Sequence, residues 1–224
     1  GEQQSFTGVL SVVMSEPQGE NAHLLPSGTA YVLQLDGEDR TVVLSLTDSE
    51  REKVRSGGRV RVTGRTRGDT FTATQLQYDI TASPTGSTAT LAAPSSTSST
   101  ATVMRTALVM MLTFSNMPVN NTVPEISGLM FSDAGSVDKV YRESSYGALG
   151  FTGTVAGPYS VGSWNSPTGS AFYDKLYKLA DTADRKAKRA GFDPAAYQHR
   201  MYVMVGFDSG GIGELGGSRT WIFS

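Results

Sequence analysis

Cysteine is absent from the 224 residues, which excludes disulfide bonds, thiolate zinc sites and cysteine-based catalysis. Net charge is also small: the formal value of -2 gives the molecule as a whole no attraction to nucleic acid or to an anionic membrane. Long hydrophobic runs are missing, and none approaches the roughly 18 apolar residues that a membrane-spanning helix needs. With 38% hydrophobic residues, the composition favours a soluble globular protein.

The first residues do not predict a signal peptide, because the run Gly1–Gln4 is polar, with neither a basic start nor an apolar stretch. Residues 83–101 carry no charge and consist almost wholly of Ser, Thr, Ala, Pro and Gly, a composition that predicts a flexible or extended linker. The linker separates a first domain, residues 1–82, from a second, residues 102–224. A Ser/Thr-rich linker favours a secreted protein whose leader has been removed over a cytoplasmic one.

The first domain has the pattern of an all-β OB-like barrel. Asp36-Gly37 predicts a tight turn between two strands, and Thr47 to Glu50 forms a capping box that begins a short helix. In the fourth strand Val60 and Val62 alternate with arginines, so the valines are expected to face inward. Three strands, a helix and two strands is the order of an OB-type barrel. The five predicted strands are residues 6–14, 30–35, 41–46, 59–64 and 71–78.

The second domain mixes strand and helix signals, which predicts an α/β layer. Residues 106–114 and 201–207 are apolar runs suited to buried strands. Between them, residues 170–190 carry an apolar stripe at helical spacing and end at Gly191, as expected of a long helix packed on a sheet. On the polar side of this helix the spacing predicts the ion pairs Asp181–Arg185 and Asp184–Lys188.

Four stretches of the second domain resemble, in order, the gametolysin family of zinc endopeptidases; they are Ser144–Gly147, Thr152–Tyr159, Ala196–Val203 and Gly216–Ile222. The resemblance covers roughly residues 102–224. It implies a partial zincin upper subdomain, a twisted sheet with a long backing helix, whose edge strand pairs with a peptide substrate as an added strand. By position, the substrate-binding edge would be Gly213, Glu214, Leu215, Gly216 and Gly217.

The same family binds zinc through His-Glu-x-x-His, and this motif does not occur in the sequence. Histidine occurs only as His23 and His199, in different predicted domains, and neither has a second histidine four residues away. The Gly-Glu-Leu-Gly-Gly run at 213–217 echoes the motif, but glycine cannot ligate zinc. We therefore expect no catalytic residue, metal site or cofactor in this chain, with zinc and hydrolysis of protein or peptide substrates belonging to the full-length secreted protein.

A second hypothesis is a non-catalytic binding protein that uses the barrel, or the sheet edge, to bind peptide, saccharide or single-stranded nucleic acid. Arg59, Arg61, Arg65 and Arg67 could form a nucleic-acid face on the barrel. Acidic residues outnumber basic ones in residues 1–82, however, and alternating arginines are typical of the solvent side of a strand. The sequence therefore favours no nucleic-acid partner and no membrane.

Overall fold

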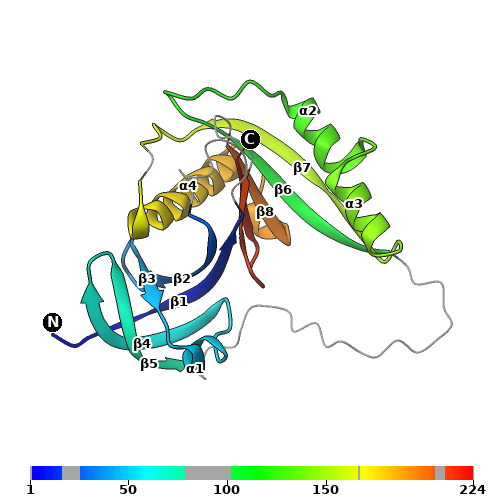
Figure 1. Cartoon of the computed structure of the whole chain (residues 1–224). Coiled ribbons are helices and arrows are strands. Elements are labelled where there is room, and N and C mark those ends of the chain that lie inside the picture. The colour runs from blue at the N-terminus through cyan, green and yellow to red at the C-terminus, as the bar shows by residue number, and fades with distance from the viewer. Residues whose placement is uncertain (1, 17–25, 79–101, 166, 205–209, 224) are drawn as a thin grey trace.

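In the computed structural model, five strands from residues 4–15 and 28–78 form a closed barrel (Figure 1). The structure describes residues 2–16, 26–78, 102–165, 167–204 and 210–223, so the predicted linker 83–101 lies outside the described residues. The barrel elements are β1 (Gln4–Ser15), β2 (Gly28–Leu35), β3 (Thr41–Ser45), α1 (Asp48–Arg51), β4 (Gly58–Arg67) and β5 (Thr70–Tyr78). Pairing runs β1-β2-β3-β5-β4 and returns to β1, which is consistent with the predicted OB-like order.

Local signals in the sequence account for most of the barrel. Val60 and Val62 are fully buried while Arg59 and Arg61 are exposed, as the alternation predicts. Gly8 lies where β1 passes between β2 and β4, and a Cβ there would overlap the backbone of Gln34. The glycine therefore permits the close strand crossing that closes so small a barrel.

The remaining strands extend the same sheet beyond the barrel. Their elements are β6 (Val103–Thr113), α2 (Val123–Ser127), the π-helix η2 (Gly128–Ser132), α3 (Val137–Ser144), β7 (Leu149–Ser160), α4 (Gly169–Arg189), the 3-10 helix η3 (Pro194–Ala196), β8 (His199–Met204), β9 (Gly210–Glu214) and β10 (Arg219–Phe223). The strand order is β9-β10-β8-β6-β7, with β9 antiparallel to β10 and the other neighbours parallel.

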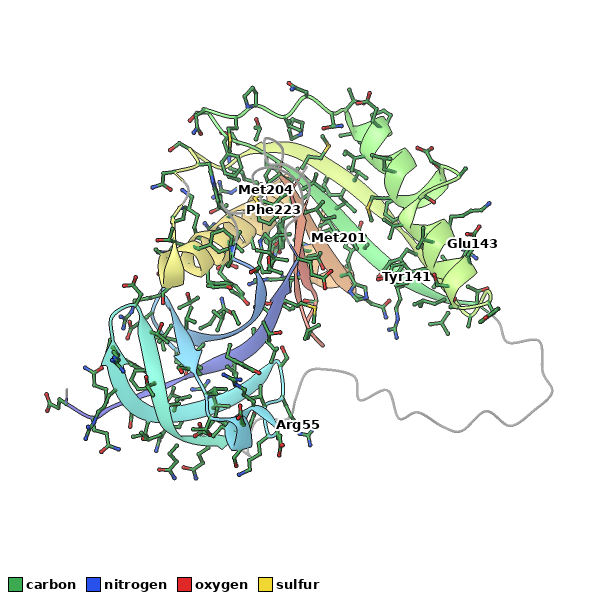
Figure 2. All side chains as sticks on the ribbon, in the orientation of Figure 1. Arg55, Tyr141, Glu143, Met201, Met204 and Phe223 are labelled. Atoms are coloured by element: carbon green, nitrogen blue, oxygen red, sulfur yellow. The ribbon has the colours of Figure 1, made fainter. Side chains whose placement is uncertain are left out.

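Helices cover both faces of this second group of strands, α4 on one face and α2, η2 and α3 on the other (Figure 1). The apolar stripe of α4 packs on side chains from β6, β8 and β10, among them Met204 and Phe223, which Figure 2 labels. On the opposite face Ile126 and Met130 pack against Val109, Met111 and Val155. Coverage on both faces explains why the central strand β6 is an almost unbroken apolar run.

Asp138 fixes α3 to the outer strand β7. Its carboxylate accepts hydrogen bonds from Arg142 Nε at 2.7 Å and from the Phe151 amide at 2.6 Å. Loss of solvent would raise the pKa of Asp138, but the hydrogen bonds from Arg142 and Phe151 outweigh it and hold the pKa below the usual 3.8.

This lowered pKa gives the fold an acid dependence. The stabilisation by Asp138 is complete above the usual pKa and is lost as pH falls through the lower pKa of the folded state. Asp138→Asn should therefore reduce the free energy of unfolding near neutral pH by about 1 kcal/mol and have a smaller effect below about pH 3. Urea unfolding of both proteins at the two pH values measures this; an equal loss at both would contradict it.

Candidate functional site

The five residues predicted as a substrate-binding edge lie at the outermost of the strands from the second group. Gly213 and Glu214 end β9, whereas Leu215, Gly216 and Gly217 belong to the turn that leads into β10. Gly216 has a positive φ of 72°, which suits a turn and not a strand. The strand thus lies three residues further towards the N-terminus than the sequence indicated, at 210–214.

The outer side of β9 is occupied by β1 of the barrel. The two strands are antiparallel, with Val13 opposite Glu214 and Met14 opposite Gly213. The amide of Leu215 donates to the Val12 carbonyl at 2.8 Å and extends the pairing. We call this contact, between residues 12–16 and 211–215, the seam. β1 therefore runs past the end of the barrel and lies along the edge predicted at 213–217, and binding of substrate at that edge stays a prediction.

Glu214 is held in place from two elements. Its Oε1 accepts a hydrogen bond from Tyr177 of α4 at 2.9 Å, and its Oε2 accepts one from the Arg219 amide at 3.2 Å. Burial raises the pKa of Tyr177, and the Glu214 charge raises it further, so the phenol remains a hydrogen-bond donor. Glu214 thereby ties the seam to α4 and to β10.

A partly buried group of polar side chains, which we call the Arg219 cluster, lies beneath α4 and includes Glu214. Arg219 is 2.9 Å from Asp181 Oδ1 and 4.0 Å from Asp184 Oδ2, and Arg200 lies 2.8 Å from Asp184. The spacing along the helix predicted ion pairs of these aspartates with Arg185 and Lys188, one turn further along. They instead contact arginines of β8 and β10, because this side of α4 faces the sheet. The cluster comprises Tyr177, Asp181, Asp184, Arg200, Tyr202, Glu214 and Arg219.

The electrostatics of the cluster fix its charges. Burial raises the pKa of Tyr202, whose hydroxyl donates to Asp184 at 3.0 Å. Burial alone would lower the pKa of Arg219, but Tyr202 and the surrounding carboxylates raise it instead. Both phenols therefore stay neutral and Arg219 stays charged around neutral pH. Such an arrangement positions β9 and β10 against α4.

A pocket of about 290 Å³ lies between the β2–β3 turn and α4. Its lining includes the acidic residues Asp36, Glu38, Asp39 and Asp174. Each of these carboxylates contacts a partner in the fold. The pairs are Asp36 with Arg59, Glu38 with Arg40, Asp39 with Lys178, and Asp174 with Thr41. The pocket is thus a polar crevice where the barrel meets α4, and its carboxylates are committed to structural contacts.

No group of three or more His, Asp or Glu side chains that could hold a metal ion occurs among the described residues. His199 is the first residue of β8, and its ring centroid is 5.7 Å from that of Phe151. Partial burial and the nearby Arg105 lower the pKa of His199, so it is neutral at physiological pH. His23 lies outside the described residues.

The barrel face that the second hypothesis needs is partly covered. OB barrels commonly bind ligands across strands 2 and 3. Here α4 packs on that side: Asp174 accepts hydrogen bonds from the amide and the hydroxyl of Thr41, and Val43 packs against the core beneath the helix. Of the arginines on β4, Arg59 is paired with Asp36 at 2.8 Å.

No helix in the described part of the chain is long and apolar enough to cross a membrane. The stretches that resemble gametolysins fall mainly on strands of the second group: residues 152–159 in β7, 199–203 in β8 and 219–222 in β10. No protein-family model and no curated protein matches the chain. Comparison with known proteins therefore assigns no family, and the geometry of the seam carries the functional argument.

Proposed function

We propose that residues 102–224 are the peptide-binding upper part of a secreted, gametolysin-like zinc metalloendopeptidase. In this proposal β9 is the strand along which a protein or peptide substrate adds in extended form. One observation carries it: β9 is the antiparallel outer strand of an otherwise parallel group, and its outer side pairs with an extended strand in antiparallel orientation. Strand addition of this kind uses backbone hydrogen bonds for affinity and alternate side chains for selectivity.

The face of β9 that is turned away from α4 supports a tolerance for varied substrates. Gly211 and Gly213 alternate with Ile212 and Glu214, which face the α4 side. Space beside both glycines is sufficient for a further atom, since the nearest neighbours of a Cβ would be 3.7 Å and 3.9 Å away. On the face of β9 that carries Gly211 and Gly213, a bound peptide would therefore meet backbone atoms. Few side chains of β9 would exclude particular side chains of the peptide.

Hydrolysis by the zinc mechanism requires a His-Glu-x-x-His motif, which this sequence does not contain. Zinc needs three protein ligands and an open position for water, and a glutamate acts as the general base. In the proposal these belong to a His-Glu-x-x-His helix after Ser224 in the full-length protein, and zinc is its cofactor. The 224-residue chain supplies the sheet that positions the substrate and is itself inactive.

The test is to determine the coding sequence beyond Ser224 and to assay the longer product on an unfolded protein substrate. We expect a His-Glu-x-x-His motif within a few tens of residues, cleavage that a chelator abolishes, and recovery on addition of zinc. Glu→Gln in that motif is the matched control and should abolish cleavage. A longer product that lacks the motif and cleaves nothing would contradict the peptidase. Peptide binding without cleavage would then favour the second hypothesis in its sheet-edge form.

A further inference from the structure

We propose that the end of β1 is an internal occupant of the peptide-binding edge of β9, so that the barrel keeps this edge closed until β1 detaches. This inference rests on the proposed function, because it assigns a regulation to the same edge. The barrel would then act as an inhibitory module of the second group of strands. Extended substrate and β1 would compete for the backbone groups of residues 211–215.

Backbone geometry supports the competition. The Val12 carbonyl accepts from the Leu215 amide at 2.8 Å, and the Glu16 amide donates to the Gly211 carbonyl at 3.4 Å. In an antiparallel ladder alternate residues face the same neighbour, so Met14 also turns its backbone groups towards β9. The backbone groups of Val12, Met14 and Glu16 therefore occupy the hydrogen-bonding positions along β9 that the backbone of a bound substrate would occupy.

The seam is short compared with the pairings that hold β1 in the barrel. β1 pairs with β9 over three residues, but with β2 over eight and with β4 over seven. Detachment from β9 would leave the β2 and β4 ladders in place. The barrel can thus release the edge as a folded unit, without unfolding.

Contacts between the barrel and α4 determine the fraction of molecules in which β1 is detached from β9. Asp174 anchors Thr41, and the Ser170 hydroxyl donates to the Asp69 carbonyl at 2.7 Å. Val13 and Val32 are also buried in the core beneath α4. Burial of these side chains favours the closed arrangement, and a tethered strand acts at an effective concentration of about millimolar. A free peptide at micromolar concentration is therefore outcompeted in the intact chain.

The experiment measures binding of a fluorescent peptide with the sequence of residues 9–16 to the 224-residue chain. Met14→Pro removes the amide that faces β9 and leaves the odd-numbered residues that face β2. Met14→Ala is the matched control, since it loses the same side chain, which is 38% exposed, but keeps the amide. We expect the proline variant to bind the peptide at least ten-fold more tightly than the unmodified chain does. This factor corresponds to the loss of about one hydrogen bond between β1 and β9, together with backbone strain. The alanine variant should resemble the unmodified chain.

A second pair of variants acts without proline. Asp174→Ala removes the anchor of Thr41 and should also increase peptide binding. Met14→Cys with Gly213→Cys places two cysteines opposite each other on a chain that has none of its own. Hydrogen-bonded antiparallel partners lie about 5.5 Å apart between Cα atoms, within disulfide range. The oxidised form should bind no peptide even when Asp174→Ala is added, and reduction should restore binding.

The outcomes separate the two proposals. Equal binding by the unmodified chain and the opening variants would overturn the inference but leave strand addition at β9 intact. No binding by folded opening variants, reduced or oxidised, would overturn strand addition and the inference with it. Binding that persists after oxidation would place the peptide elsewhere and also contradict the inference.

Discussion

Arg219→Ala is expected to lower the free energy of unfolding by about 2–3 kcal/mol, less than for a fully buried ion pair, because Asp181 is 41% exposed. The Arg219 side chain is only 15% exposed, lies 2.9 Å from Asp181 and stacks over the Tyr177 ring at 5.6 Å. Without it, the carboxylates of Asp181, Asp184 and Glu214 remain close together beneath α4 with less positive charge to balance them. Denaturant unfolding followed by circular dichroism measures the loss.

Arg200→Ala is the matched control, because Arg200 pairs with Asp184 but is more exposed, at 24%. Its loss leaves Arg219 to balance the cluster, so we expect a cost well below that of Arg219→Ala. Adding Asp184→Asn to Arg219→Ala should recover part of the stability by removing one uncompensated charge. Equal effects of the two arginine variants would show that the cluster contributes as ordinary surface charge.

Trp221→Ala should destabilise the chain by about 3–5 kcal/mol, because it leaves a large cavity in the core. Trp221 is fully buried in β10, with ring centroids 5.3 Å from Tyr177 and 5.7 Å from Tyr202. It therefore joins α4, β8 and β10. Thermal unfolding should shift to markedly lower temperature, and the seam should open with it because β10 holds β9.

The variant Trp221→Phe separates the contribution of aromatic packing from that of the indole N–H group. The indole N–H of Trp221 is buried and has no hydrogen-bond partner within the described part of the chain, so its removal costs no hydrogen bond. Phenylalanine keeps an aromatic ring between the two tyrosines, and we expect a loss clearly smaller than for alanine. A loss as large as that of Trp221→Ala would mean that the shape of the indole, more than the aromatic contact, holds the strand.

Much of the barrel could be predicted because its signals are local. Asp36-Gly37 predicted the β2–β3 hairpin, and the Thr47 capping box predicted the start of α1; the structure confirms both. The long helix was expected at 170–190 and spans Gly169–Arg189. Each of these elements depends on residues within a few positions of one another, where spacing and capping chemistry decide the conformation.

The partners of the helix could not be predicted in this way. Spacing identifies only neighbours one turn along, so the sequence paired Asp181 with Arg185 and Asp184 with Lys188. In the fold both aspartates are near Arg219, which is more than thirty residues away along the chain. Trp221 and Phe223 are likewise buried beneath α4, which is distant from them in the sequence. Contacts between elements that are distant in the sequence, such as α4 and β10, produce no periodic pattern within either element that would identify its partner.

By itself, the sequence determined which groups this chain lacks: it has no cysteine, no paired histidines and no His-Glu-x-x-His motif, and these absences can be read directly from the residues. It also determined the strand alternation and the apolar helical stripe, which follow from local periodicity. Only the tertiary structure decided that β1 runs beyond the barrel and closes the edge of β9. Met14 and Gly213 come together because each strand has an unpaired side at the same place, and hydrogen bonds between backbone groups are nearly independent of residue type.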